Sequence, residues 1–507
     1  MSTSDNRRII KNTGMLYVRM LFLMGVSLYT SRIILDVLGI EDYGIYNIVG
    51  GIVALFSFLK NALSISTSRF LTFEIGRKDF DKLKETFSSS YSIHIFLAIL
   101  VFIIAETIGL WFLYNKIVIP PERLQAAVWT YHFSVLTSLV TIIQVPYNAA
   151  IIAHEKMDVY AYISIIEVIL NLSIVYLLYL YDHDKLIFYA VLMLVVRIII
   201  AFIYRFYCIK NYKECRYKYT WKSDLYKSIA FFSGWSLLGS LNFVLLTQGS
   251  NILLNLFFGP LVNAAYGISI QVNTAVNLFV KNFQTASRPQ IVKLYADNRK
   301  SEMKTLVINT TRFSYFLLLI LTLPVILETK IILELWLKEI PEHAVIFVQL
   351  ILIDALITTF DSSLYFVFNA MGRLKENAII SPIIGFLVIP VSFILFRLGF
   401  EPSVIFYVQI VKSIIMSIFV KPILLYKYAD YILNDFISIF LPCIIVTIIA
   451  ITPPLIIHNI FSEGWQRLVY VVFTSLVSVS ISTFFIGISK ANRIKIIYII
   501  RKNIINR

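Results

Sequence analysis

Charged side chains inside long apolar stretches are the residues of this sequence whose types could do chemistry. The basic ones are Arg19, Arg32, Lys60, Arg197, Lys281, Arg312 and Lys412, and the acidic ones are Glu106, Glu167, Asp354 and Asp361. An ionisable group at membrane depth is costly, so it faces a cavity, pairs with a partner, or extends its stem to the interface. Lys and Arg are natural ligands of phosphate, whereas carboxylates can hold protons or cations.

Sequence motifs of soluble enzymes and of metal sites are absent. No Gly-Lys dipeptide and no G-x-G pattern occurs, so neither a Walker A loop nor a dinucleotide-binding loop of that type exists. The six histidines are scattered, and Cys208, Cys215 and Cys443 form neither a disulfide framework nor a zinc motif. The outer loops are also too short for a catalytic domain. We therefore expect no enzyme activity, no metal and no cofactor.

The elements that must position these charges are membrane helices. The chain has 507 residues, of which 58% are hydrophobic and 15% charged, against about 25% charged in ordinary soluble domains. Separated apolar blocks of about 20 residues match the bilayer core, where unsatisfied backbone enforces helices. The predicted spans are 13–36, 43–66, 88–114, 124–149, 159–181, 186–207, 230–256, 262–285, 305–327, 344–370, 376–396, 403–425, 435–458 and 467–488.

The distribution of Lys and Arg between the loops predicts the orientation. Most of the 45 basic residues fall in alternate segments that begin with the N-terminus, and the opposite loops hold only Lys116, Arg123, Lys185, Lys330, Lys338, Arg397 and Arg467. This bias predicts that both termini and the Tyr-rich linker at 204–227 are cytoplasmic. It also accounts for the net charge of +15 without nucleic acid as a partner.

The two halves of the sequence echo each other at an offset of about 220 residues. Residues 31–39 (SRIILDVLG) match 250–259 (SNILLNLFFG), and Lys60-Asn61 matches Lys281-Asn282. Ser-Arg pairs at 68 and 287 and Pro-Glu pairs at 121 and 341 continue the match. Repeats in one orientation are typical of transporters whose substrate lies between the halves. We expect an N-lobe at 1–210 (helices 1–6), a linker at 211–229, a C-lobe at 230–428 (helices 7–12), and two further helices with a basic tail at 429–507.

These features resemble the polysaccharide-transporter (Wzx-type) flippases of the multidrug/oligosaccharidyl-lipid/polysaccharide (MOP) exporter superfamily. The resemblance rests on residues 31–49 (SRIILDVLGIEDYGIYNIV), with which the first predicted helix ends, on Ser68-Arg69, and on Leu335-Trp336-Leu337 followed by Pro341-Glu342. It implies an all-α MATE-like fold of about 14 transmembrane helices, with two pseudo-symmetric six-helix lobes around a central cavity.

The resemblance also implies a function and partners. The implied function is transfer of a polyprenyl-diphosphate-linked oligosaccharide from the inner to the outer leaflet of the bacterial inner membrane by alternating access. This step serves O-antigen, capsule or exopolysaccharide assembly. The implied partners are the lipid-linked oligosaccharide, membrane lipids, polysaccharide polymerase machinery and a coupling H⁺ or Na⁺, and the implied carrier is a monomer.

Four basic residues are the expected substrate-binding side chains. Arg19, Lys60 and Lys281 fall in the predicted spans 13–36, 43–66 and 262–285, and the corresponding helices line the cavity in the resembled fold. Each lies about four to seven residues from a cytoplasmic helix end, or roughly 6–10 Å deep, where it could bind the diphosphate. Arg32 lies one turn from the outer end of helix 1, where binding substrate and snorkelling both remain open. We interpret the remaining three, Arg197, Arg312 and Lys412, as snorkelling residues.

The acidic residues leave two further alternatives. Asp354 and Asp361 in the predicted span 344–370 could bind a coupling ion, or they could be polar residues satisfied between helices. A cation-coupled multidrug antiporter of the same superfamily is the main rival function, but a cationic cavity would repel cationic drugs. The other alternative is a membrane-embedded scaffold or enzyme of envelope-polysaccharide assembly.

Overall fold

The computed structural model of this chain is helical throughout. It describes residues 3–154, 156–219, 223–371, 375–488 and 493–494, and these residues contain no β-strand. Ten helical segments within the described residues are long and apolar enough to cross a membrane. Each of the 14 predicted spans falls largely on helical residues, so the predicted all-α class is confirmed. The chain is therefore a multi-pass membrane protein.

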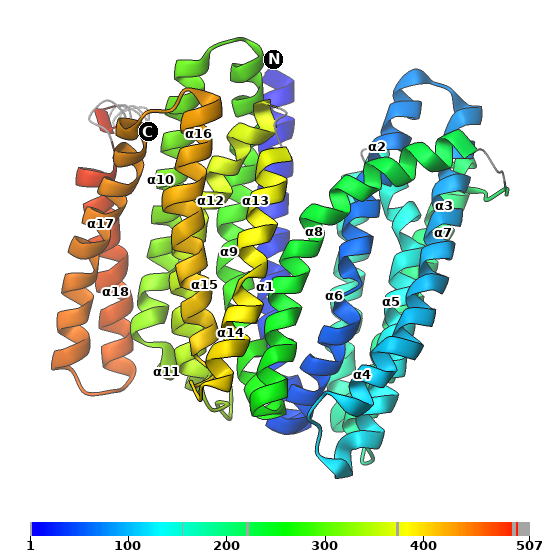
Figure 1. The fold of residues 1–507 in the computed structure, drawn as a ribbon, viewed down its shortest axis with the longest axis horizontal. Helices are drawn as coiled ribbons and strands as arrows, with labels where there is room; N and C mark the ends of the chain where they lie inside the picture. Colours follow the sequence, from blue (N-terminus) through cyan, green and yellow to red (C-terminus); the bar gives the residue numbers. More distant parts are fainter. Residues whose placement is uncertain (1–2, 155, 220–222, 372–374, 489–492, 495–507) are drawn as a thin grey trace. The chain divides into compact units, whose positions relative to one another are not determined.

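The chain forms two compact units, and the first comprises Met1–Gly267 together with Leu337–Glu342. Its helices are α1 (Thr3–Ala54), α2 (Ser57–Arg77), α3 (Phe80–Ile104), α4 (Leu110–Asn115), α5 (Leu124–Ala153), α6 (Met157–Tyr179), α7 (Lys185–Asn211) and α8 (Ser223–Phe258), followed by the start of α9 (Pro260–Ala296). Figure 1 shows α5 running beside α3 and α7 in this unit. Part of its core consists of Ile45, Ile48, Tyr131 and neighbouring apolar residues.

The second unit comprises Ile268–Trp336 and His343–Arg507. It holds the rest of α9 and α10 (Lys300–Leu327), α11 (Thr329–Trp336), α12 (Ala344–Met371), α13 (Lys375–Phe386), α14 (Val388–Arg397), α15 (Val404–Ile414), α16 (Lys421–Ala429), α17 (Leu433–Ile460) and α18 (Trp465–Ser482). One π-helical stretch, Ile415–Val420, joins α15 to α16. The two units divide the chain within α9, and the lobe boundaries drawn from the sequence remain a prediction.

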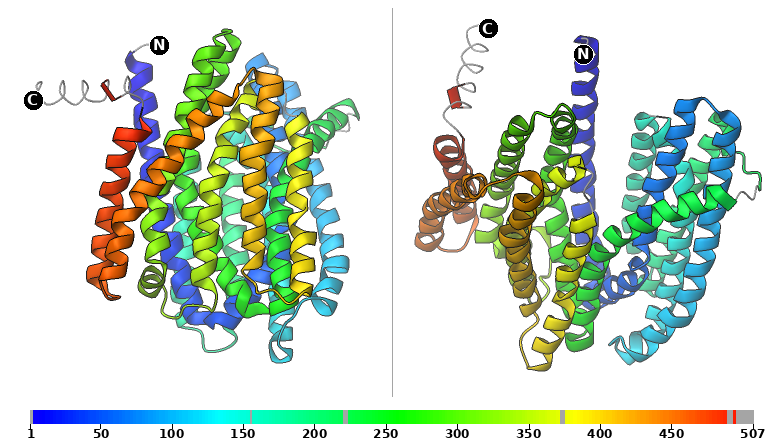
Figure 2. Two further views of the ribbon diagram at one scale, coloured as in Figure 1. Left: turned by 60° about the vertical axis from the view of Figure 1, so that its left-hand side comes forward. Right: turned by 45° about the horizontal axis from the view of Figure 1, so that its top comes forward.

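The last two helices, α17 and α18, pack beside each other at one edge of the second unit (Figure 2). A buried carboxylate on this unit, Glu328, ties both helices to the end of α10. It accepts hydrogen bonds from Arg467 at 2.9 and 3.1 Å and contacts His458 at 2.8 Å. Glu328 is only 1% exposed, and a buried carboxylate needs such partners. The helix pair that follows the repeat is thus fixed to its own unit.

A left-handed glycine forms the same corner in each half of the sequence. Gly39 lies inside α1, and Gly259 joins α8 to α9; both have φ of +79°. A β-carbon is disfavoured at such a φ, which glycine adopts readily. The two corners fall at matching points of the repeat, so the repeat read from the sequence is also a repeat of backbone geometry.

Gly39→Ala and Gly259→Ala should each destabilise the protein by about 1–2 kcal/mol, because alanine is strained at positive φ. No steric clash adds to this cost, since a β-carbon would meet no atom closer than 3.9 Å at either position. The measurement is the apparent melting temperature in detergent.

Gly25→Ala is the matched control, because Gly25 lies in α1 with open space around it and no positive φ. This substitution should be neutral or slightly stabilising. Equal melting temperatures for Gly25→Ala and the two corner variants would contradict the strain argument.

Candidate functional site

A buried ion pair links two helices of the second unit. Lys421, the first residue of α16, is 1% exposed, and its Nζ lies 3.1 Å from a carboxylate oxygen of Asp361 on α12. The ammonium group also lies 5.4 Å from the ring centroids of Tyr365 and Phe368. The sequence did not predict this pair, because Lys421 falls near the end of the predicted span 403–425. Asp361 is therefore neutralised by a cation of the protein itself.

Asp354 lies two helical turns before Asp361 on α12 but has different partners. Ser413 at the end of α15 donates to its carboxylate at 2.5 Å, and Thr358 lies 3.5 Å from the other oxygen. The Thr358 hydroxyl is also 3.3 Å from the Ser413 hydroxyl. Within the described residues, Asp354 forms no salt bridge with a basic side chain. Its surroundings are hydroxyl oxygens, which are hard donors suited to a proton or a small cation.

Three charged side chains in the spans of the first unit have partners within the helix bundle. Arg197 on α7 forms a salt bridge with Glu167 on α6, and Glu106 lies 3.0 Å from His132 on α5. Arg197 also lines a cavity of about 280 Å³, together with hydroxyls such as those of Ser134 and Thr137. The snorkelling interpretation of Arg197 is therefore wrong, because its guanidinium is held inside the bundle by a carboxylate.

Glu106 belongs to a π-helical stretch, Ala105–Gly109, whose geometry has a local cause. Tyr131 of α5 donates a hydrogen bond to the carbonyl of Ala105 at 2.6 Å. The Tyr131 hydroxyl lies where a β-carbon on Gly109 would be, so only glycine leaves room for it. Stretches of π-helix recur at functional sites, and this one carries a membrane carboxylate.

A network of asparagines packs α8 and α9 against α1 in the first unit. Asn263 donates to the side chain and backbone of Asn251 at 2.7 Å, and Asn251 donates to the backbone of Asn47 at 3.1 Å. A β-carbon on Gly51 would approach Asn251 to 2.6 Å, so glycine permits this close contact. Buried amides stabilise a packing only when their hydrogen bonds are made, and here they bond to one another.

The predicted substrate-binding residues are spread over three helices. Arg19 lies in α1 and Lys60 in α2, but their side chains are outside the described residues. Lys281 is an exposed residue of α9. Arg32 is half-buried in α1, one turn from Asp36, whose carboxylate lies 2.6 Å from Lys338. The hydrogen bond from Lys338 to Asp36 raises the pKa of Lys338. Grouping of Arg19, Lys60 and Lys281 at one mouth remains a prediction.

The described part of the linker is docked on the first unit. Glu214 lies 2.5 Å from His154, whose ring stacks on Tyr212 at 4.1 Å. Burial raises the pKa of Glu214, but the hydrogen bond with His154, a hydrogen bond with its own backbone and the charge of His154 together outweigh burial, so the pKa lies below its usual value. The linker thus has fixed contacts at the end of α5, which charge and Tyr content alone did not reveal.

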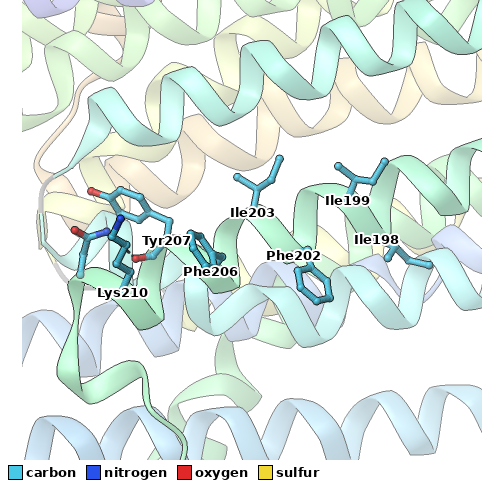
Figure 3. Close-up of a pocket in the computed structure, with 8 residues that line it drawn as sticks. Ile198, Ile199, Phe202, Ile203, Phe206, Tyr207 and Lys210 are labelled. Carbon is cyan, nitrogen blue, oxygen red and sulfur yellow. Dashed lines mark hydrogen bonds between the residues drawn. The ribbon is translucent and has the colours of Figure 1, made fainter.

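A surface cavity of about 730 Å³ follows α7 (Figure 3). Apolar side chains including Ile199, Phe202 and Phe206 line it, with Tyr207 and Lys210 at one end. All of its lining residues belong to one helix, so it is an outward face rather than an enclosed site. An apolar face of this kind suits lipid chains.

Comparisons with known proteins agree with this architecture. A family model described as MatE matches residues 16–177, whereas among curated protein sequences none matches this chain. The lipid II flippase MurJ in an inward closed conformation is similar with a TM-score of 0.66 at 14% identity, covering 92% of this chain and 98% of MurJ. The chain has the fold of MOP-superfamily transporters. Two further solved structures extend this similarity.

An inward-facing multidrug resistance MATE family transporter of the MOP superfamily has a TM-score of 0.62 at 12% identity, covering 80% of this chain and 99% of its own. A MOP-superfamily transporter from Pyrococcus furiosus, described as having a binding pocket of reverse polarity, has a TM-score of 0.54 at 14% identity. That match covers 80% of this chain and 95% of the other. One MOP fold thus accommodates proteins described as a lipid flippase and as multidrug transporters, so the substrate must be argued from the side chains.

The loss of stability on breaking the Lys421–Asp361 pair should depend strongly on which of the two residues is replaced. Asp361→Asn leaves a buried ammonium unpaired and should cost about 3–5 kcal/mol. Lys421→Met should cost less, because Asp361 is 29% exposed and can reach water. The double variant should recover most of the loss. A double-mutant cycle of thermal unfolding in detergent measures the coupling.

Lys300→Met is the matched control for this cycle. Its partner Asp430 lies 3.0 Å away, but both side chains are exposed, and exposed pairs contribute little. If the double variant were as unstable as Asp361→Asn alone, the two residues would not be energetically coupled.

Proposed function

We propose that this chain is a flippase that moves a polyprenyl-diphosphate-linked oligosaccharide from the inner to the outer leaflet of the bacterial inner membrane. Alternating access would carry the sugar through the protein while the lipid tail stays in the bilayer. The fold, shared with the lipid II flippase MurJ over 92% of this chain, supports a carrier for a large lipid-linked substrate. The fold equally suits multidrug transporters, so the sign of the charge in the spans must distinguish the two.

The observation that carries the proposal is the pairing of two carboxylates in the described spans with basic side chains. Glu167 pairs with Arg197, and Asp361 pairs with Lys421. A carrier of cationic drugs needs fixed negative charge to attract its substrate, but these carboxylates are already occupied by cations of the protein. The basic residues Arg19, Lys60, Lys281 and Arg32 supply charge of the opposite sign. Such a balance suits an anionic diphosphate.

In this proposal, Arg19, Lys60 and Lys281 bind the diphosphate at the cytoplasmic entrance. Lys60 and Lys281 fall at matching positions of the repeat, so each half contributes one ammonium group. Arg19 adds a guanidinium, which can form two parallel hydrogen bonds to a phosphate. Arg32, near the outer end of α1, would meet the diphosphate late in the transport cycle.

Coupling to an ion would reside at Asp354. Asp361 already has Lys421 as its counter-ion, so it has little charge left for a second cation. Asp354 is surrounded by the hydroxyls of Ser413 and Thr358, which can share a proton or ligate Na⁺. Both aspartates were expected as coupling residues, and the contacts favour Asp354.

Alanine substitution of the basic residues should impair transport by removing charge-assisted contacts. Each of Arg19→Ala, Lys60→Ala and Lys281→Ala should weaken lipid binding about tenfold to a hundredfold, since such a contact contributes about 1.5–3 kcal/mol. Arg19→Lys and Lys60→Arg should retain partial activity. The measurement is the leaflet distribution of a lipid-linked oligosaccharide after reconstitution into liposomes.

Lys330→Ala is a suitable control, because Lys330 is exposed and pairs with Glu463 outside the spans. Transport at the parental rate by the triple alanine variant would rule out this binding site. Export of cationic dyes but not of the lipid would instead support the multidrug alternative.

Asp354→Asn should abolish the stimulation of transport by an imposed Na⁺ or proton gradient, because it removes the negative charge that holds the ion. Ser413→Ala should weaken the stimulation by removing a ligand. The control is the double variant Asp361→Asn/Lys421→Met, which should keep the stimulation because it removes a neutralised pair. Gradient-driven transport that survives Asp354→Asn would exclude this residue as the coupling site.

A further inference from the structure

Two contacts in the first unit occupy matching positions of the internal repeat. Asp36 and Asn255 are each the sixth residue of the matched segments that begin at Ser31 and Ser250. Val118 and Lys338 each lie three residues before a Pro-Glu pair. These four positions therefore form two equivalent pairs, each consisting of a helix end and a loop residue.

The first contact is ionic and joins the first helix of the first half to the loop of the second half. Lys338 donates to the carboxylate of Asp36 at 2.6 Å, and Tyr179 donates to the same carboxylate oxygen at 3.0 Å. The Lys338 side chain is 59% exposed, so water competes for this bond.

The second contact is made by an amide, and here the helix belongs to the second half and the loop to the first half. Asn255, on the first helix of the second half, receives the backbone N–H of Val118 at 2.8 Å and donates to the Val118 carbonyl at 3.2 Å. Asn255 is fully buried, and its amide also donates to Asn263 at 2.9 Å. One asparagine thus satisfies both backbone groups of a loop residue.

We propose that these two contacts form a reciprocal outer clasp, in which the first helix of each half holds the outer loop of the other half. Both contacts lie at the predicted outer ends of the helices, and each is followed by the left-handed glycine corner at Gly39 or Gly259. A route that opens to the outside requires both loops to leave these helices. The clasp is therefore a gate, and its action does not depend on the identity of the substrate.

The two arms of the clasp should differ in strength. Asn255 is buried and would leave the N–H and carbonyl of Val118 without their partner if it were replaced, which is costly. The ionic arm is exposed and screened by salt, so it contributes less. The asparagine arm should therefore contribute more than the lysine arm to holding the gate closed. The contribution of the lysine arm should be sensitive to salt.

The test measures access from the outside to a cysteine that lies inward of the clasp. Ser250→Cys is introduced into a chain lacking Cys208, Cys215 and Cys443, because Ser250 is fully buried on α8, about 14 Å inward of Gly259. An impermeant maleimide is added to intact cells, and the labelling rate is recorded. No substrate is needed, so failure of this test is separate from failure of the proposed function.

Asn255→Ala should raise the labelling rate about fivefold to thirtyfold, and Asp36→Asn or Lys338→Met at most about fivefold. Asp36→Asn with Asn255→Ala should approach the product of the single effects. High salt should mimic Lys338→Met and add little to it. The exchange Asp36→Lys/Lys338→Asp should return the rate toward that of the parent, which also shows that the variant folds.

The matched control removes an exposed ion pair outside the clasp, between Lys330 and Glu463; Lys330→Ala should leave the rate unchanged. A parental labelling rate in both Lys338→Met and the Asp36→Asn/Asn255→Ala variant overturns the clasp. So does a charge exchange that labels as fast as Lys338→Met.

Discussion

The cost of an unpartnered charge at membrane depth is the constraint on which this structure depends. In a medium of low dielectric constant, an isolated ion is so unfavourable that it must be paired, hydrated or titrated. Two pairs in the described spans satisfy this constraint with partners from neighbouring helices, Glu167–Arg197 and Asp361–Lys421. Such pairs also fix the rotation of each helix, because a helix turned by one residue would separate its charge from the partner.

The same constraint distinguishes Asp354 from the paired carboxylates, because its neighbours are the hydroxyls of Ser413 and Thr358. A counter-ion that belongs to the protein neutralises its carboxylate without any ion from solution, whereas hydroxyls can exchange partners with a mobile ion. In the proposed mechanism, the contrast between Asp354 and Asp361, two turns apart on α12, separates a site able to respond to an ion gradient from a structural pair. The proposed preference for an anionic substrate follows from the same logic, since paired carboxylates do not attract cations.

The sequence predicted the helices well because the bilayer restricts them so strongly. Blocks of about 20 apolar residues mark every span, and the repeat around Gly39 and Gly259 locates matching corners. Partners across helices could not be predicted, because hydropathy does not give the rotation of one helix relative to another. The pairing of Lys421 with Asp361 was therefore not predicted, and Arg197 was interpreted as snorkelling although it pairs with Glu167. Both cases concern the direction of a side chain.

The two halves retain one backbone plan while their side chains have diverged. The glycine corners have identical φ values, yet the sixth residue of the matched segment is aspartate in one half and asparagine in the other. The facing loop position is lysine where the helix carries the acid, and valine where the helix carries the amide. An amide can bind any residue's backbone, so Val118 needs no polar side chain, whereas a carboxylate needs a donor such as lysine. Each substitution thus fits its own partner, and the backbone repeat supports two chemically different contacts at one geometry.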